Sequence, residues 1–246
     1  MSIAGGMRFR ADGRTPGQMR PVSVELDVQK WAAASLVFRQ GDTHVLCSAT
    51  VEDRIPPHLR GKGTGWVTAE YAMLPGATSE RMQRESVRGK LGGRTYEIQR
   101  LIGRSLRGVV DTSVMGERTV TVDCDVLQAD GGTRCASITG GFIVLSLALR
   151  KAGLERAIVS KIAAISVGIV AATPLLDLEY TEDSTAEVDF NVVGTDANTY
   201  VEIQGTAEGK PFDRHQMDEL LALADTGLQK LFAIQDGILA PTRTAT

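Results

Sequence analysis

The sequence of 246 residues predicts an α+β fold made of two similar halves, each a group of β-strands followed by a helix. Two observations predict this arrangement. Short segments in which apolar and polar residues alternate, as they do in half-buried strands, occur in both halves of the chain. A helical segment with an apolar face follows each group of strands, which indicates a structural duplication without an evident sequence repeat. The chain is long enough for one large domain or for two small, closely packed ones.

The first half is predicted to hold five strands and two loops. Val22–Val28 alternates cleanly, and two further strands flank the turn at 40–42 as a hairpin, the second of them apolar enough to be central in a sheet. Residues 54–65 contain two prolines, three glycines and three cations and predict a mobile basic loop. Residues 75–93 predict a long loop or a weak helix. The predicted strands are 22–28, 35–39, 43–51, 66–74 and 120–126.

An amphipathic helix is predicted over Thr95–Val110, with arginines opposite an apolar stripe. Arg94 directly precedes this helix and therefore lies near the positive end of the helix dipole. A cation is unfavourable there, and a bound anion would relieve the cost. An exposed arginine on a loop is the competing interpretation. The stripe consists of Ile98, Leu101, Ile102, Leu106 and Val109.

A strand, a glycine turn and a helix start follow one another between residues 120 and 149. The alternation stops at the turn formed by residues 130–132, Asp-Gly-Gly, after which Thr133 is predicted to be the helix N-cap. From Phe142 to Leu149 the chain is almost wholly apolar, which predicts a helix buried on all sides. The N–H groups of the Gly132–Thr133 turn, the positive helix end and the guanidinium of Arg134 would form a phosphate-sized anion site. The alternative is a tight turn whose glycines serve backbone geometry only.

The second half is predicted to contain four strands and a long helix. Residues 173–174, Thr-Pro, end its first strand, and residues 182–184 form a turn before its third. The helix at 213–234 carries an apolar stripe that includes Leu220 and Leu228. The predicted strands are 162–172, 175–180, 187–193 and 200–204.

Two aspartates of this half are candidates for chemistry. Asp183 is predicted in the turn, and Asp189 follows six residues later on the polar face of a strand. Two carboxylates that meet at the mouth of a strand can hold Mg²⁺ or supply a proton to a leaving oxygen. The competing interpretation makes Asp183 a turn former and Asp189 a solvent-facing charge.

The net charge of −3 conceals an uneven distribution along the chain. Residues 54–107 carry eleven basic and four acidic side chains, a net of +7, whereas residues 177–219 carry two basic and twelve acidic ones, a net of −10. Charge runs are usually solvated faces. A basic segment in one half and an acidic segment in the other also suit a polyanion surface and a metal site or self-complementary assembly.

Several other classes of protein are disfavoured. No apolar run is long enough for a membrane span, and the N-terminus lacks the apolar core of a secretion signal. Three cysteines without a CxxC pair argue against disulfides or zinc and favour a cytosolic protein. The serine-hydrolase, P-loop and HExxH motifs are absent. His44, Trp66 and Tyr71 are predicted to pack in the core, although Trp66 and Tyr71 could instead stack on bases.

Taken together, these motifs resemble those of the ribonuclease PH family, whose members are phosphate-dependent exoribonucleases that trim tRNA 3′ ends. The resemblance covers nearly the whole chain, and its last three segments are highly specific in combination. Its segments are 10–22, 65–75, 93–111, 123–141 and 176–193.

The resemblance implies a fold and an assembly. The fold would consist of two similar halves, 1–153 and 154–246, each a mixed β-sheet packed with helices, as in the ribosomal protein S5 domain 2-like superfamily. The assembly would be a homo-hexamer built as a trimer of dimers. No membrane contact is expected, and the expected location is the cytoplasm.

The resemblance also assigns roles to particular residues. Arg94, Gly132, Thr133 and Arg134 would bind inorganic phosphate, the co-substrate. Asp183 and Asp189 would be catalytic and would hold Mg²⁺. The expected substrates are tRNA precursors and other RNA 3′ ends, and a reversible reaction would release nucleoside diphosphates. The residues expected to contact RNA are Arg60, Lys62, Arg81, Arg84, Arg88 and Lys90.

Two other functions compete with phosphorolysis. A hydrolytic two-metal nuclease would need more convergent carboxylates than this pair and would have no use for an anion-binding turn. A non-catalytic RNA-binding ring subunit would have no need for both the phosphate-binding arginines and both aspartates. The joint presence of these groups therefore favours a phosphorolytic enzyme.

Overall fold

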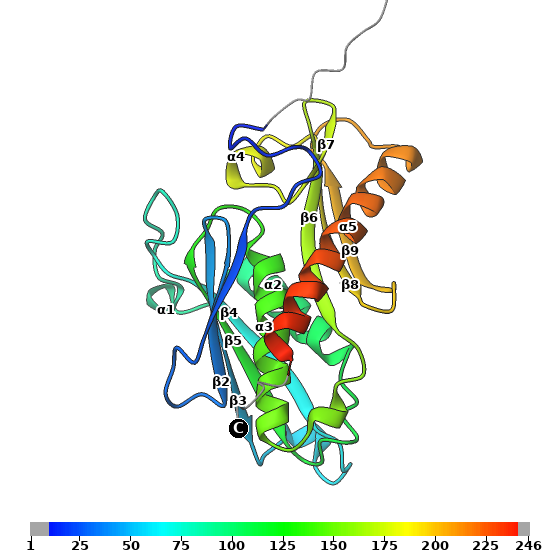
Figure 1. Cartoon of the computed structure of the whole chain (residues 1–246). Helices are drawn as coiled ribbons and strands as arrows, with labels where there is room; N and C mark the ends of the chain where they lie inside the picture. The colour runs from blue at the N-terminus through cyan, green and yellow to red at the C-terminus, as the bar shows by residue number, and fades with distance from the viewer. Residues whose placement is uncertain (1–9, 241–246) are drawn as a thin grey trace, which may run out of the picture.

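The computed structural model describes residues 10–240, apart from the side chain of Arg88, and shows an α+β arrangement of two sheets with helices packed against them (Figure 1). In the first sheet β4 runs parallel to β5, and all other neighbouring strands are antiparallel, so this sheet is mixed. Its strands, in the spatial order β1-β2-β3-β5-β4, are β1 (Val22–Leu26), β2 (Ala34–Gln40), β3 (Thr43–Glu52), β5 (Thr119–Gln128) and β4 (Trp66–Met73).

The second sheet is antiparallel throughout, in contrast to the mixed sheet expected for this half. Two hairpins, β6–β7 and β8–β9, form it, and neither includes a crossover helix that would allow parallel pairing. Its strands, in the order β7-β6-β8-β9, are β7 (Thr173–Leu176), β6 (Ile162–Val170), β8 (Val188–Thr195) and β9 (Tyr200–Ala207).

The helices differ greatly in length. Three of them are long enough to carry core contacts, and two consist of a single turn. Short 3₁₀ turns lie at Pro57–Leu59 and Glu155–Ala157. The α-helices of the described range are α1 (Glu85–Arg88), α2 (Gly93–Arg107), α3 (Thr133–Lys151), α4 (Tyr180–Asp183) and α5 (Arg214–Leu239).

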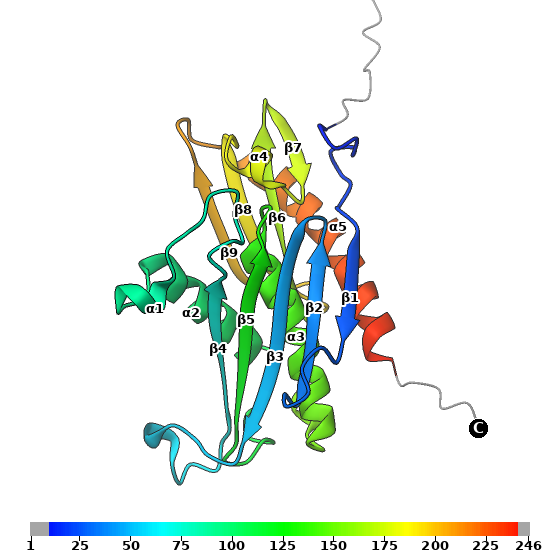
Figure 2. The ribbon, with the colours of Figure 1, turned by 90° about the vertical axis from the view of Figure 1, so that its left-hand side faces the viewer.

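The position of helix α3 explains why its sequence is apolar on every side. It packs against β2, β3 and β5 of the first sheet and against β6 of the second, so it lies between the two sheets. Helix α2 covers β4 on the same face of the first sheet (Figure 2), and α5 covers β6 and β7. One continuous hydrophobic core joins both halves of the described chain. The two sheets therefore hold the ends of α2 and α3 in fixed positions relative to β8.

Most strands and the three long helices confirm the predictions from periodicity. Val120, Val122, Cys124 and Val126 are all buried, as their alternation requires. The predicted hairpin has a two-residue turn, with Gln40 paired to Thr43. The stripe of α2 is buried, and α5 starts at the capping box that Asp213 forms. The three cysteines are free and buried.

Five local predictions were wrong. Strand β6 ends at Val170, because Ala171 and Ala172 adopt positive φ angles and turn the chain into β7 before Thr173. The strand predicted at 175–180 is therefore shifted, and the predicted turn at 182–184 is the end of helix α4. Gly132, with φ +66°, is the N-cap of α3, so Thr133 is its first helical residue. His44 lies half-buried on β3 and not in the core.

Candidate active site

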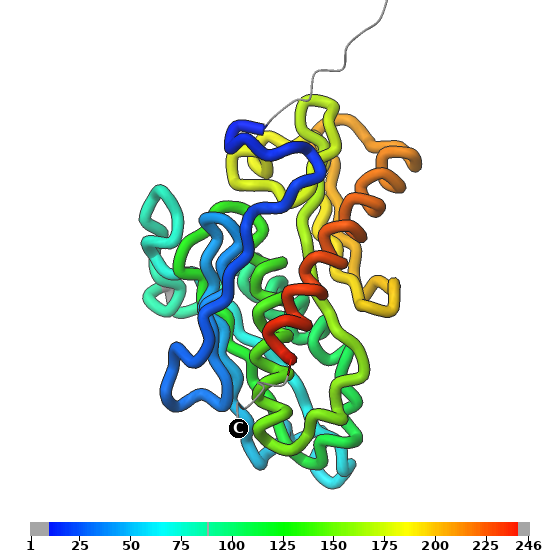
Figure 3. The backbone as a smooth tube through the Cα atoms, viewed as in Figure 1, coloured from blue at the N-terminus to red at the C-terminus, as the bar shows by residue number. Residues whose placement is uncertain are grey.

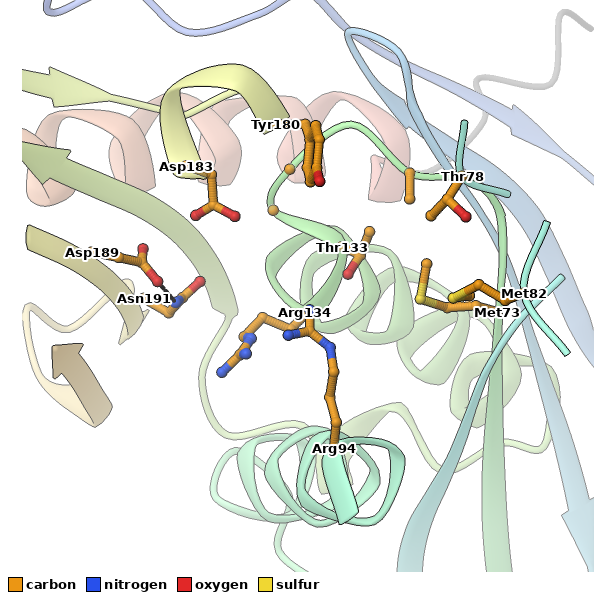
Figure 4. Close-up of a pocket in the computed structure, with 13 residues that line it drawn as sticks. Met73, Thr78, Met82, Arg94, Thr133, Arg134, Tyr180, Asp183, Asp189 and Asn191 are labelled. Carbon is orange, nitrogen blue, oxygen red and sulfur yellow. Dashed lines mark hydrogen bonds between the residues drawn. The ribbon is translucent and has the colours of Figure 1, made fainter. Parts of the chain in front are cut away.

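A pocket of ≈ 320 Å³ opens where the ends of α2, α3, α4, β4 and β8 meet (Figure 4). Both halves of the chain contribute to it, and it contains every residue that was predicted to bind phosphate or metal. Arg94, the glycine turn with Arg134, and the two aspartates come from three separate stretches of the chain, so the fold itself assembles the group. The walls are formed by Met73, Thr78, Met82, Arg94, Ala129, Gly131, Gly132, Thr133, Arg134, Tyr180, Asp183, Asp189 and Asn191.

The glycine turn before α3 is required by its surroundings. Gly131 and Gly132 have φ angles of +74° and +66°, a conformation that side chains with a Cβ rarely adopt. A Cβ on Gly131 would lie 2.5 Å from the carbonyl oxygen of Leu178. The first N–H groups of α3 have no intrahelical partners, and no side chain caps this helix end. The turn therefore presents the positive end of α3 to the pocket.

Two arginines approach the pocket from neighbouring helix ends. Helix α2 starts at Gly93, two residues before the predicted start at Thr95, so Arg94 is its second residue. Arg134 is the second residue of α3. Figure 4 shows the two side chains next to each other on the side of the pocket opposite Asp183. The guanidinium of Arg134 donates to Oε1 of Gln204 and lies 3.9 Å from Oε1 of Glu97. The hydrogen bond to the neutral Gln204 orients Arg134, and the positive charge of Arg134 remains available to an anion.

Thr133 is fixed by an aromatic residue of the first sheet. Its Oγ1 forms a hydrogen bond of 3.0 Å with the hydroxyl of Tyr71, which is buried as predicted. Burial raises the pKa of the Tyr71 hydroxyl, so it remains protonated. Thr133 consequently serves as a positioned hydroxyl at the pocket wall, in place of the capping role expected from the sequence.

Asp183 and Asp189 enter the pocket from the second half, at the end of α4 and at the start of β8. Burial raises the pKa of Asp183, although Arg94 and Arg134 oppose that effect. Burial, and then the charge of Asp183, raise the pKa of Asp189 to about 6. Oδ2 of Asp189 accepts a hydrogen bond of 3.4 Å from Nδ2 of Asn191, but its Oδ1 is buried without a partner. Asp189 is thus part of a pocket wall and not a solvent-facing charge.

The six residues expected to contact RNA fall into two groups. Arg81, Arg84 and Lys90 are exposed on the segment between β4 and α2, which also places Met82 in the pocket. Arg60 and Lys62 lie in the loop before β4, at the opposite end of that strand from the pocket. A strand of eight residues spans about 26 Å. The two groups therefore lie far apart within one chain, and the side chain of Arg88 lies outside the described structure.

The sequence did not identify a second wall of the pocket. Met73, Met82 and Tyr180 form a largely apolar surface beside the charged groups (Figure 4). The Tyr180 side chain is exposed, at 59%. Only Asn191 had a detectable signal, since it follows Asp189 by two residues and so shares its face of the strand.

Comparison with known proteins extends these observations. Domain 1 of the 3′ exoribonuclease family matches residues 18–155, and domain 2 of that family matches residues 161–227. Ribonuclease PH of Roseobacter denitrificans is 56% identical over 237 residues, covering 94% of this chain and 100% of the relative. Ribonuclease PH of Syntrophomonas wolfei subsp. wolfei is 56% identical over 235 residues, covering 94% and 98%.

Two solved structures share the fold at low sequence identity. The crystal structure of rice (Oryza sativa) Rrp46 has a TM-score of 0.75 and 18% identity, and it covers 92% of this chain and 98% of that chain. The Archaeoglobus fulgidus exosome with RNA bound to the active site has a TM-score of 0.77 and 21% identity, with 92% of both chains covered. These two similarities confirm the α+β fold.

Proposed function

Because this chain belongs to the 3′ exoribonuclease family, we propose that the pocket binds inorganic phosphate next to the last phosphodiester bond of an RNA. The protein is a phosphorolytic 3′-to-5′ exoribonuclease of the ribonuclease PH type, which trims the 3′ ends of tRNA precursors and releases nucleoside diphosphates. The single observation that carries the assignment of the site is that Arg94, Arg134 and both aspartates share one pocket.

The arginine side of the pocket suits the nucleophile. Arg94, Arg134 and the N–H groups at Gly132–Thr133 would hold phosphate by charge-assisted hydrogen bonds. An oxygen of that phosphate attacks the phosphorus that joins the last two nucleotides, and the bond from phosphorus to the 3′ oxygen of the penultimate nucleotide breaks. The products are a nucleoside diphosphate and an RNA with a free 3′ hydroxyl. Positioning and charge neutralisation supply most of the catalysis in such transfers.

The carboxylate side of the pocket fits a Mg²⁺ ion. Oδ1 of Asp189 is buried and unpartnered, and the charges of Asp183 and Asp189 repel each other. A bound cation would give Oδ1 a partner and would offset this repulsion. Within residues 10–240 no group of three His, Cys, Asp or Glu side chains could hold a metal. Mg²⁺ characteristically keeps waters and substrate phosphate oxygens as its other ligands, so two carboxylates suffice. When bound, Mg²⁺ would neutralise charge on the transferred phosphoryl group.

A proton must also reach the leaving 3′ oxygen. Without a bound cation, Asp189 has a pKa of about 6 and can exchange protons near neutral pH, as a general acid must; a Mg²⁺ ion held on the same oxygen would lower this pKa. Asp183 also has a raised pKa and lines the same pocket. The site thus contains two carboxyl groups able to perform this step.

The apolar wall suits the terminal nucleoside. Once the phosphate and carboxylate sides are assigned, the remaining surface is formed by Met73, Met82 and Tyr180 together with small residues. A base has a π-face that stacks on aromatic side chains irrespective of its identity. Binding through this wall would allow any of the four nucleotides to be removed.

We further propose a homo-hexamer, a trimer of dimers, of chains whose halves 1–153 and 154–246 each supply one side of the site. Arg60 and Lys62 lie about 26 Å along β4 from the pocket of their own chain. In an assembly, these residues can contact RNA that is bound at a neighbouring active site. The free, buried cysteines suit the reducing environment of the cytoplasm.

The proposed site is tested with radiolabelled phosphate and an unstructured RNA. The label should appear in nucleoside diphosphates, and Arg134→Ala should suppress its incorporation at low phosphate. Arg150→Ala is the matched control, because Arg150 lies at the far end of α3 and pairs with Glu155 on the surface. Release of monophosphates in phosphate-free buffer would contradict phosphorolysis.

A further inference from the structure

The segment of residues 10–20, here called the arginine segment, has three buried arginines that the mechanism above does not use. Arg10, Arg14 and Arg20 are 9%, 6% and 6% exposed. Figure 3 shows this segment passing round the turn that contains α4. Backbone contact anchors it there, since the N–H of Leu176 donates to the carbonyl oxygen of Pro16 at 2.9 Å. The segment therefore lies directly behind the carboxylate side of the active site.

Arg10 holds the short helix that carries Asp183. Its Nε donates to Oε1 of Glu182 at 2.6 Å, and its Nη2 donates to Oε2 of the same carboxylate. Its two Nη atoms also donate to the carbonyl oxygens of Leu176 and Asp177, at 2.6 and 2.8 Å. Glu182 is the residue next to Asp183, and its carboxylate also accepts from the N–H of Glu179 to cap α4. A helix of one turn has little stability of its own, so these contacts determine where Asp183 lies.

Arg20 connects the carboxylate side to the phosphate side. Its side chain donates to both carboxylate oxygens of Asp177, at 2.6 and 3.1 Å, and Asp177 is 1% exposed. Its Nη1 donates to the carbonyl oxygen of Asp130, at the start of the glycine turn. Nη2 lies 3.3 Å from the position that a Cβ on Gly132 would occupy, so the guanidinium packs directly against the turn. One side chain thus contacts both halves of the site.

We infer that Arg10 and Arg20 are positioning residues, which set the placement of Asp183 relative to the phosphate-binding turn. This inference rests on the proposed function, because it assigns Asp183 to the reaction and the turn to phosphate. Lysine can replace the charge of an arginine but not its planar, two-pronged hydrogen bonding. Arg10→Lys and Arg20→Lys therefore preserve charge and disturb geometry.

The two variants should have different kinetic effects. Arg10→Lys should lower kcat about 10- to 100-fold, the scale expected for a misplacement of about 1 Å, and leave the phosphate KM unchanged. Arg20→Lys should lower kcat and also weaken phosphate binding, measured by calorimetry without RNA. Arg150→Lys is the control, since Arg150 also pairs with a glutamate but lies about 25 Å away along α3.

A double-mutant cycle separates positioning from general stability. If Arg10 acts through Asp183, Arg10→Lys should have little additional effect on single-turnover rates in an Asp183→Asn background. A purely structural role would give the same loss in both backgrounds, and that result would overturn the inference. Wild-type kcat in a folded Arg10→Lys protein would also overturn it. If Asp183→Asn alone retained wild-type turnover, the proposed function would have failed instead.

Discussion

Asp189 makes the protein less stable in exchange for an active site, and Asp189→Asn should reveal the cost. The pKa of this carboxyl is raised to about 6, from 3.8, by burial and by the charge of Asp183. Such a rise corresponds to about 3 kcal/mol between the folded and unfolded states. Asparagine keeps an oxygen that accepts from Asn191 and removes the charge. In protein without bound metal at pH 8, the variant should therefore be more stable than the wild type by up to about 3 kcal/mol.

The pH dependence of this difference follows from the direction of the shift. Well above pH 6, for example at pH 8, Asp189 is ionised in both states, and the full cost of burying its charge is present. As the pH falls through 6, the folded state binds a proton before the unfolded state does, and the cost decreases. About half of this free-energy cost should remain at pH 5, and none should remain below 3.8, the pKa of the unfolded state.

The assay is urea unfolding of both proteins at pH 8 and pH 5, in the presence of a chelator. The midpoint difference should be large at pH 8 and about half as large at pH 5, while the variant loses turnover. An equal stability at pH 8, or a difference that does not change with pH, would refute the reasoning. Addition of Mg²⁺ should stabilise the wild type and not the variant.

Three further predictions test other parts of the site. Arg134→Ala removes a charge-assisted donor and should raise the phosphate KM about 10- to 150-fold in steady-state assays, and an unchanged KM would exclude Arg134 from phosphate binding. Tyr180→Ala should raise the RNA KM about 5- to 150-fold while Tyr180→Phe does not, and an RNA with an abasic terminal nucleotide should bind equally to both variants. The binding constant for tRNA precursors should fall steeply with salt, by about 0.7–0.9 log units per phosphate contact for each tenfold rise in salt concentration. An assembly-deficient variant should bind these precursors much more weakly than the wild type does, with a smaller loss for short single-stranded RNA. Equal losses for the two substrates would contradict a role for the ring.

The sequence predicted the strands and long helices because their periodicity reflects burial of one face. It failed at short elements, where no period can develop. Helix α4 contains four residues, and its position depends on Glu182 and the distant Arg10, so neither alternation nor helical spacing could predict it. The N-cap of α3 was misplaced by one residue because Gly132 adopts a left-handed conformation that composition alone does not specify.

The pocket was predictable in part. Alternation placed Asp189 and Asn191 on one face of β8, but it could not show that α3 covers this face, where Sγ of Cys135 donates to Oδ1 of Asn191 at 3.3 Å. The apolar wall was also missed, since Met73 and Tyr180 come from different halves of the chain. Such a surface becomes visible only when the two sheets have been packed together.

The opposite charges of the two halves make the two sides of the proposed site dependent on each other. Arg94 and Arg134 lower the pKa of both aspartates and so partly offset the cost of burying their charges. A phosphate bound to those arginines would cancel much of their positive field, and the aspartates would then be harder to ionise. A divalent cation held by the aspartates would restore the balance, so each ion should strengthen the binding of the other to the same extent. On this argument the charge pattern of the sequence, basic in one half and acidic in the other, serves to make the pocket receptive to phosphate and metal together.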